Sequence, residues 1–560
     1  MKQKIQDSSK LKQGAFILVL SSALVKIISA LFKVPLSSDV CLGDLGFGYF
    51  SSAHDVFMPI YFIAVSGFPV AISHLVSDYV ARGNYKVAER TFKISKKLIL
   101  LLSLICFVIY IAAVFPFVNF VDKTGDSIYS FLAVAPSIIF CFWASCYRGY
   151  YEGLGNMKPA AVSNIIEALG KLILGLGLAL AVIKISGNPA FAAAAAMFGI
   201  SLGALASAIY LRLKYRKNNY LKNSDIDDSS ISNSQIAKKI IIIAIPIVFA
   251  SLSTSIVAFI DGLTVRYQLS ELLTQNPQGL TKMFSDVINE YEAEIGAVLS
   301  NEELPTVLYG IRSKAFTFFN LIPTLTMAIG VGLIPAVTES FSKKDNVSLK
   351  NNLAAVIKMS ALICFPAGLG YFVFGEKVMS LLYGAGASSQ FGGEMLKLYG
   401  IAAIFAGFSL PLASVLHAVG KQNHAFVNVI LGIISKIILN IILCSIESVN
   451  IYGSVISTLA CFALICILDL VCFLLSVGKI PNVFHNLFKP FFAAVICVGI
   501  AYLFGMLSDS SLIILISILL AMVVYFVSLS IFNFFEESDI LVLPMGEKLV
   551  GIFKKLKIVR

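Results

Sequence analysis

Long apolar runs, each about the length of a membrane span, constrain this chain more than any other feature. Fourteen such runs follow one another, and a helix of about 20 residues crosses the hydrocarbon core of a bilayer. Hydrophobic residues make up 58% of the sequence and charged residues only 13%, with a mean hydropathy of +0.87. Soluble domains carry roughly 25% charged residues. The runs are too long for barrel strands, so the sequence predicts an all-α polytopic membrane protein with about 14 transmembrane helices.

The predicted spans are separated by polar segments. They cover residues 14–36, 54–79, 98–118, 128–147, 159–183, 189–211, 240–265, 315–338, 353–374, 396–418, 423–445, 452–477, 490–507 and 511–533.

A glycine-rich turn with the apolar run behind it occurs twice. The stretch RGYYEGLGNMKPAAVSNIIEALGK, residues 148–171, is partly repeated by ASVLHAVGKQNHAFVNVILGIISK, residues 413–436. Such self-similarity indicates a duplicated unit. Six spans return the chain to the same side of the membrane, so the two lobes are predicted to be parallel pseudo-repeats. Four residues of the first copy recur at one constant offset: Gly155, Ala160, Val162 and Lys171 correspond to Gly420, Ala425, Val427 and Lys436.

The repeat and the polar segments predict the domain organisation. Residues 1–212 form an N-terminal lobe, and residues 213–238, rich in Asn, Ser, Asp and Lys, read as a flexible cytoplasmic linker. Residues 239–478 form a C-terminal lobe whose outside loop, 267–314, carries a short acidic helix. Residues 479–560 add a final helix pair and a basic cytoplasmic tail.

The basic balance of the chain is explained by the membrane. Its net charge is +11. Most of the Lys and Arg residues fall in the segments that are cytoplasmic if both termini are cytoplasmic, which is the distribution that the positive-inside rule requires. Anionic membrane lipids are the expected partner of these loops, and no nucleic-acid partner is needed.

Cations within or at the ends of the spans are the main functional feature. A lone charge at mid-membrane costs on the order of 3 kcal/mol even on a lenient scale, so these side chains should face a bundle interior or a wet cavity. A phosphate or diphosphate group would supply the counter-charge. Snorkelling to the headgroups is the alternative for Lys33. The predicted substrate-binding cations are Lys26, Lys33, Lys171, Lys436, Arg312 and Lys314.

Other polar residues are candidates for ion pairs, gating or coupling. Arg148 could pair with Glu152 four residues on, and Glu167 precedes Lys171 in the favourable order for a helical ion pair. Arg266, near the outer end of the seventh span, is a further gating or ion-pair candidate. His54 and Asp55 open the predicted second span and could titrate during transport, or they could simply be an interfacial end.

Catalytic and nucleotide-binding motifs are not apparent. The sequence contains no HExxH, Walker or GxSxG pattern and no metal-spaced cluster of His and Cys. We therefore expect a protein that is not an enzyme, needs no cofactor and is not an ATP-driven pump by itself.

Several stretches resemble one known family. The turn at 148–171, the stretch SSALVKIISALFKVPLSSDVCLGDLGFGYF at 21–50, TESFSKKDN at 338–346 and the C-terminal LPMGEKLVGIFKKLK are similar to the stage V sporulation protein B group of polysaccharide exporters. This group belongs to the multidrug/oligosaccharidyl-lipid/polysaccharide superfamily and is related to the lipid II flippases.

The resemblance implies fourteen helices in two lobes around a central cationic cavity. It also implies alternating access that moves an undecaprenyl-diphosphate-linked sugar from the inner to the outer leaflet of the bacterial plasma membrane, for cell-wall or spore-cortex synthesis. Cell-wall synthesis proteins would be possible partners.

The family's functional residues match this sequence only in part. Lys26 and Lys33 stand near the cations of the family's first helix, and Arg312 and Lys314 near that of the eighth. An arginine of the family's second helix has no clear counterpart here. Some relatives couple transport to Na⁺ or the membrane potential, and by resemblance Asp261 and Asn440 could take part.

Two other functions fit the same composition. A cation or drug antiporter of the same superfamily would need membrane-buried acids, whereas the mid-span charges of the first lobe are mostly lysines. A non-transporting membrane scaffold of a cell-wall machine would need its loops and not its buried charges. A membrane-embedded transferase would require a convergent acid/base pair, which the sequence does not offer.

Overall fold

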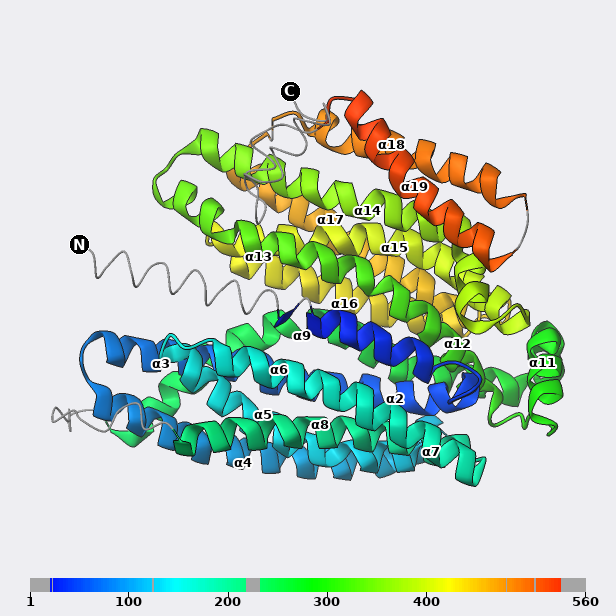
Figure 1. Cartoon of the computed structure of the whole chain (residues 1–560), viewed down its shortest axis with the longest axis horizontal. Helices are drawn as coiled ribbons and strands as arrows, with labels where there is room; N and C mark the ends of the chain where they lie inside the picture. Colours follow the sequence, from blue (N-terminus) through cyan, green and yellow to red (C-terminus); the bar gives the residue numbers. More distant parts are fainter. Residues whose placement is uncertain are drawn as a thin grey trace. The chain divides into compact units, whose positions relative to one another are not determined.

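Helices make up every regular element of the chain that the structure describes, as predicted (Figure 1). These helices pack as two compact units, which consist of the described residues within Met1–Met283 and Gly296–Ser313, and those within Phe284–Ile295 and Lys314–Arg560. The computed structural model describes residues 21–22, 24–122, 125–217, 232–479, 481–507 and 510–534.

The first unit is built around α5, which packs against α3, α4 and α8. A helix over residues 24–36 precedes the labelled elements. Two short π-helical segments, η1 and η3, interrupt longer helices, and a third, η2, ends α4. The elements of this unit are α2 (Gly43–Phe62), η1 (Ile63–Gly67), α3 (Phe68–Ala81), α4 (Tyr85–Phe117), η2 (Val118–Asp122), α5 (Ile128–Gly153), α6 (Lys158–Gly170), η3 (Lys171–Gly175), α7 (Leu176–Ser186), α8 (Pro189–Lys217), α9 (Asn233–Gln275) and α10 (Pro277–Met283).

The second unit is built around α15, which packs against α13, α14 and α17. Helix α12 (Leu304–Phe319) begins in the first unit, up to Ser313, and ends in the second. Helices α18 and α19 pack on each other, and α18 also packs on α14. The elements of this unit are α11 (Ser285–Ile295), α13 (Leu321–Ser342), α14 (Asn346–Tyr383), α15 (Ala387–Ala418), α16 (Gln422–Cys444), α17 (Tyr452–Val477), α18 (Val483–Gly505) and α19 (Ser511–Ile531).

Within the described residues, 11 helical stretches are long and apolar enough to cross a membrane, and they coincide with 11 of the 14 predicted spans. The predicted span 14–36 lies partly outside the described residues, and 240–265 falls inside α9. The predicted span 315–338 is interrupted at Asn320, between α12 and α13. The chain is a multi-pass membrane protein, and the count of fourteen stays a prediction.

Helix α4 illustrates why these helices need a membrane. Large aliphatic side chains along one stretch of it are exposed, among them Leu101, Val108 and Ile109, each more than half exposed. A helix that is hydrophobic all round is stable only where lipid or protein covers it.

The second span begins earlier than the apolar pattern predicted. Helix α2 starts at Gly43, so His54 lies 11 residues into the helix and not at its outer end. Eleven residues of α-helix rise by roughly 16 Å. His54 and Asp55 therefore lie inside the helix and not at its start, and their place relative to the membrane interface stays a prediction.

Helix α9 begins at Asn233, before the predicted start of the C-terminal lobe at residue 239. Near the end of the predicted linker, Ser232 and Gln235 form a capping box at the start of α9. The side chain of each accepts a hydrogen bond from the backbone N–H of the other. The predicted linker, 213–238, is helical to Lys217 and from Asn233, and residues 218–231 lie outside the described residues. We predicted that residue 239 opens the C-terminal lobe, but α9 packs against α2, α3 and α4 of the first unit.

The predicted outside loop, 267–314, is largely helical. Helix α9 continues to Gln275, and α12 already begins at Leu304. The predicted short acidic helix is present as α11, and the Glu290 carboxylate of α11 accepts a 2.7 Å hydrogen bond from the backbone N–H of Ser388, at the start of α15.

The two copies of the turn have the same local geometry. Gly155 has φ of +72° and Gly420 has φ of +75°, a region that favours glycine. One residue later, Asn156 N–H donates to the Tyr151 carbonyl and Lys421 N–H to the Leu416 carbonyl. The duplication seen in the sequence thus extends to the backbone of the turn, where glycine ends one helix and lets the next begin.

Glycines bring the end of α6 and η3 into direct contact with α8. A Cβ added to Gly199 would lie 2.2 Å from the Cα of Gly175, and one added to Gly170 would lie 2.5 Å from the Cα of Gly203. The backbones of η3 and α8 therefore touch, which fixes the position of Lys171 at the start of η3.

This contact makes a testable prediction. Gly199→Ala should lower the stability of the protein by about 1–3 kcal/mol, because no flexible side chain can move away. The control is Gly177→Ala, whose Cβ would meet nothing within 4 Å and which should be neutral or slightly stabilising. Thermal unfolding in detergent measures both, and equal midpoints for the two variants would contradict the packing described.

Candidate functional site

A buried ion pair joins α5 to α6 inside the first unit. Arg148 Nη2 donates to Glu167 Oε2 at 2.8 Å, and both side chains are at most 6% exposed. Arg148 also donates to the hydroxyls of Ser163 and Ser207, each at 2.9 Å. The guanidinium thus ties α5, α6 and α8 together. A charge buried this deeply is tolerated because it is paired and hydrogen-bonded.

This pairing differs from the predicted one. We expected Arg148 to pair with Glu152 on the same helix, but the structure pairs it with Glu167 across two helices. Arg148 is buried where α5 packs on α8, whereas Glu152, one turn further, is half-buried. Helical spacing favoured Glu152, and the packing of three helices favoured Glu167.

The predicted pair of Glu167 and Lys171 is present. Lys171 Nζ lies 3.3 Å from Glu167 Oε1, and the lysine side chain is 23% exposed. Tyr61, from α2, donates to the same carboxylate oxygen at 2.9 Å, and Lys171 Nζ lies 5.0 Å from the centre of the Tyr61 ring. Tyr61 precedes η1 and Lys171 opens η3, so each partner is next to a π-helical segment, a feature frequent at functional sites.

Three lysines share this region of the first unit. Lys171 acts electrostatically on both Lys26 and Lys33, which lie on the helix over residues 24–36. Lys26 is exposed and Lys33 is half-buried. Three of the predicted cations are therefore neighbours, and like charges held together this way favour an incoming anion.

Asp55 links the lysines to α12. Its carboxylate accepts a 2.7 Å hydrogen bond from the Tyr309 hydroxyl, and it lies 3.4 Å from His54 Nδ1. Lys33 interacts electrostatically with both His54 and Asp55. The predicted titratable pair thus lies beside the lysines, inside helix α2.

A second buried ion pair lies along α12. Arg312 pairs with Asp261 of α9, both fully buried, and the guanidinium lies 5.4 Å from the Tyr309 ring centre. Arg266 of α9, also buried, donates to Thr306 Oγ1 at 3.1 Å. Asp261, predicted to bind a coupling ion, is thus engaged by Arg312. The functional roles of these residues stay predictions.

The remaining predicted residues belong to the second unit. Lys314 is buried, and its ammonium lies 4.7 Å from the ring centre of Tyr383. Lys436, fully buried on α16, donates to oxygens of α17. Asn440, one turn after Lys436, accepts from Ser457 Oγ at 3.3 Å. The ammonium partners of Lys436 are the carbonyl of Ser454 at 3.3 Å, Ser457 Oγ at 3.2 Å and Thr458 Oγ1 at 2.8 Å.

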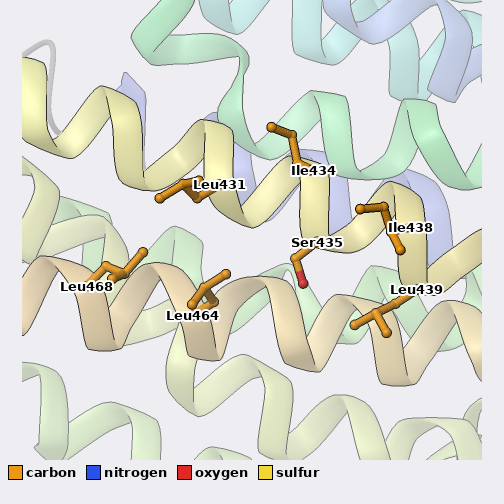
Figure 2. Close-up of a pocket in the computed structure, with 7 residues that line it drawn as sticks. All are labelled: Leu431, Ile434, Ser435, Ile438, Leu439, Leu464 and Leu468. Carbon is orange, nitrogen blue, oxygen red and sulfur yellow. The ribbon is translucent and has the colours of Figure 1, made fainter.

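An open groove of about 520 Å³ runs between α16 and α17 (Figure 2). Six leucine or isoleucine side chains and Ser435 line it. Such a surface suits hydrocarbon and offers a phosphate no cation. The groove is therefore distinct in chemistry from the lysines of the first unit.

Four hydroxyl partners of Arg148, Glu167 and Asp55 were not predicted from the sequence. They are hydroxyls that read as ordinary members of apolar runs. A tyrosine within a span needs a partner for its hydroxyl, so Tyr61 and Tyr309 could have been suspected. The four are Tyr61, Ser163, Ser207 and Tyr309.

Comparisons with known proteins agree with this architecture. Residues 11–270 match the family model described as polysaccharide biosynthesis protein, and residues 321–520 match that described as lipid II flippase MurJ. Two relatives come from Bacillus subtilis strain 168. The lipid II flippase MurJ is 23% identical over 78% of this chain and 77% of the relative, and stage V sporulation protein B is 23% identical over 81% and 82%.

A solved structure shares the fold. The lipid II flippase MurJ in an inward closed conformation has a TM-score of 0.64 at 15% identity, over 92% of this chain and 99% of that chain. Fold and matches together place the chain among multi-pass membrane proteins similar to polysaccharide biosynthesis proteins and lipid II flippases. In sequence the chain is similar to the lipid II flippase MurJ and to stage V sporulation protein B, and its fold is similar to that of MurJ.

The buried pair of Arg148 and Glu167 makes a prediction about stability. Arg148→Met should lower stability by about 3 kcal/mol or more, because the carboxylate of Glu167 loses its buried partner. Adding Glu167→Gln should recover part of this loss. Unfolding midpoints of the single and double variants in detergent give the coupling free energy between Arg148 and Glu167.

The exposed pair of Arg82 and Asp78 is the matched control. Its atoms are 2.9 Å apart, but the arginine side chain is 66% exposed, so Arg82→Met should cost at most about 1 kcal/mol. Equal losses for Arg82→Met and Arg148→Met would show that burial does not set the strength of the internal pair.

Proposed function

We propose that this protein is a flippase for an undecaprenyl-diphosphate-linked sugar. A lipid II-like peptidoglycan precursor or another lipid-linked oligosaccharide would move from the inner to the outer leaflet of the bacterial plasma membrane by alternating access. Both termini would be cytoplasmic, and the product would serve cell-wall or spore-cortex synthesis. Relatives named as a lipid II flippase and a sporulation protein support this proposal.

The single observation that carries the proposal is the grouping of Lys26, Lys33 and Lys171. Ammonium groups at membrane depth are costly unless they serve a site. A diphosphate carries enough negative charge to neutralise several of them, and lysine binds phosphate as a point charge without strict geometry. The polyprenyl chain would remain in the lipid while the headgroup passes these lysines.

Translocation would be coupled to the membrane potential, to Na⁺ or to protons, and His54 and Asp55 are the proposed proton-carrying groups beside the lysines. The chain would not be an enzyme, since its proposed chemistry is binding and release of an unchanged lipid.

Replacing Lys26 and Lys33 by alanine tests the proposal. In proteoliposomes with a fluorescent lipid-linked diphosphate sugar, outward transfer should slow by about tenfold or more, the effect of losing contacts to a charged group. Accessibility of the label to a membrane-impermeant quencher reports the transfer. Lys184→Ala, which alters an exposed lysine at the end of α7, should transfer at the parental rate.

Two outcomes would favour other functions. Unimpaired transfer by the double variant, together with protection of cells from cationic dyes, would favour a drug or cation antiporter. Loss of cell-wall function on changing residues 213–238 or 267–314, with the lysines dispensable, would favour a scaffold.

A further inference from the structure

The carboxylate of Glu167 serves two cations and a hydroxyl at once. Its Oε2 accepts from Arg148 at 2.8 Å. Its Oε1 accepts from Tyr61 at 2.9 Å and lies 3.3 Å from Lys171 Nζ. The side chain of Glu167 is only 4% exposed. One internal anion is therefore shared between two positively charged side chains.

The two cations are held to different degrees. Arg148 is 6% exposed on its side chain, and two serine hydroxyls fix its guanidinium in addition to Glu167. Lys171 is 23% exposed and its distance to the carboxylate is longer. An ammonium on a four-carbon stem is also more mobile than a guanidinium fork. Lys171 is therefore the cation that can separate from the Glu167 carboxylate, whereas Arg148 remains paired with it.

The surroundings of Lys171 favour a change of its partner from Glu167 to another anion. Lys26 and Lys33 repel it, and its backbone is fixed by the contact of η3 with α8. A change of partner is therefore confined to the side chain. When Lys171 leaves, Arg148 and Tyr61 still satisfy Glu167, so no buried carboxylate is left unpaired.

We propose that Glu167 is an exchangeable counter-ion that holds Lys171 while the site is empty and yields it to the substrate's diphosphate. This inference rests on the proposed function of the lysines. On release of the headgroup, the internal carboxylate takes Lys171 back and thereby competes with the phosphate. A transport site must bind well enough to load and weakly enough to unload, and Glu167 sets that balance.

Glu167→Gln tests the exchange, because glutamine keeps the size and the acceptor for Tyr61 and removes the charge. With farnesyl diphosphate as the probe and purified full-length protein in detergent, apparent affinity should rise by about three- to tenfold, the factor expected from removing a partly exposed ion pair that competes with the ligand. Outward transfer in proteoliposomes should slow, because release of the headgroup loses its competitor.

Tyr61→Phe is the second variant, and it should act in the opposite direction. The Tyr61 hydroxyl and the Lys171 ammonium share Oε1 of Glu167. Without the hydroxyl, Oε1 holds Lys171 more tightly, so probe affinity should fall. The phenyl ring retains the contact with the ammonium. A merely structural Glu167 would make both variants weaker binders in step with lost stability, and that result overturns the inference.

Further variants separate this inference from the proposed function. Lys171→Ala and the Lys26→Ala, Lys33→Ala double variant should each weaken probe binding. If neither does, the proposed function fails. If both do, but Glu167→Gln fails to tighten binding, only the exchange is wrong. Should Glu167→Gln not fold, the direction of the Tyr61→Phe shift decides.

Discussion

Neutralisation of charge inside an apolar bundle is the constraint on which the first unit depends. Arg148 and Glu167 are buried together, and the guanidinium reaches α5, α6 and α8 through one carboxylate and two hydroxyls. Without that pairing either charge would be costly at this depth. The same carboxylate also lies beside Lys171. Glu167 therefore both stabilises the packing of the helices and positions a cation of the proposed site.

Much of the fold could be predicted because span length and apolarity are local properties of the sequence. Eleven predicted spans coincide with helices, and the pair of Glu167 and Lys171 followed from helical spacing. Partners from distant segments could not be predicted in this way. Arg148 pairs with Glu167 and not with Glu152, because α5, α6 and α8 meet at Arg148. Tyr61 and Tyr309 lie in apolar stretches of the sequence, and only the fold shows that their hydroxyls donate to carboxylates.

The duplicated turn shows how one scaffold position acquires two chemistries. Gly155 and Gly420 end their helices with the same left-handed backbone, and Lys171 and Lys436 follow at the same distance. Lys171 meets a carboxylate and is partly exposed, whereas Lys436 meets neutral oxygens of α17 and is fully buried. The repeat predicted the position of the second lysine but not its environment, which depends on side chains that the two copies do not share.

The glycine contacts of α6 and η3 with α8 have a mechanical consequence. Backbones that touch at Gly175 and Gly199, and again at Gly170 and Gly203, leave no side-chain layer that could slide. We therefore expect helices α6 to α8 to move together during a rearrangement of the first unit. A hinge is then expected outside helices α6 to α8, and Lys171 would move together with these helices.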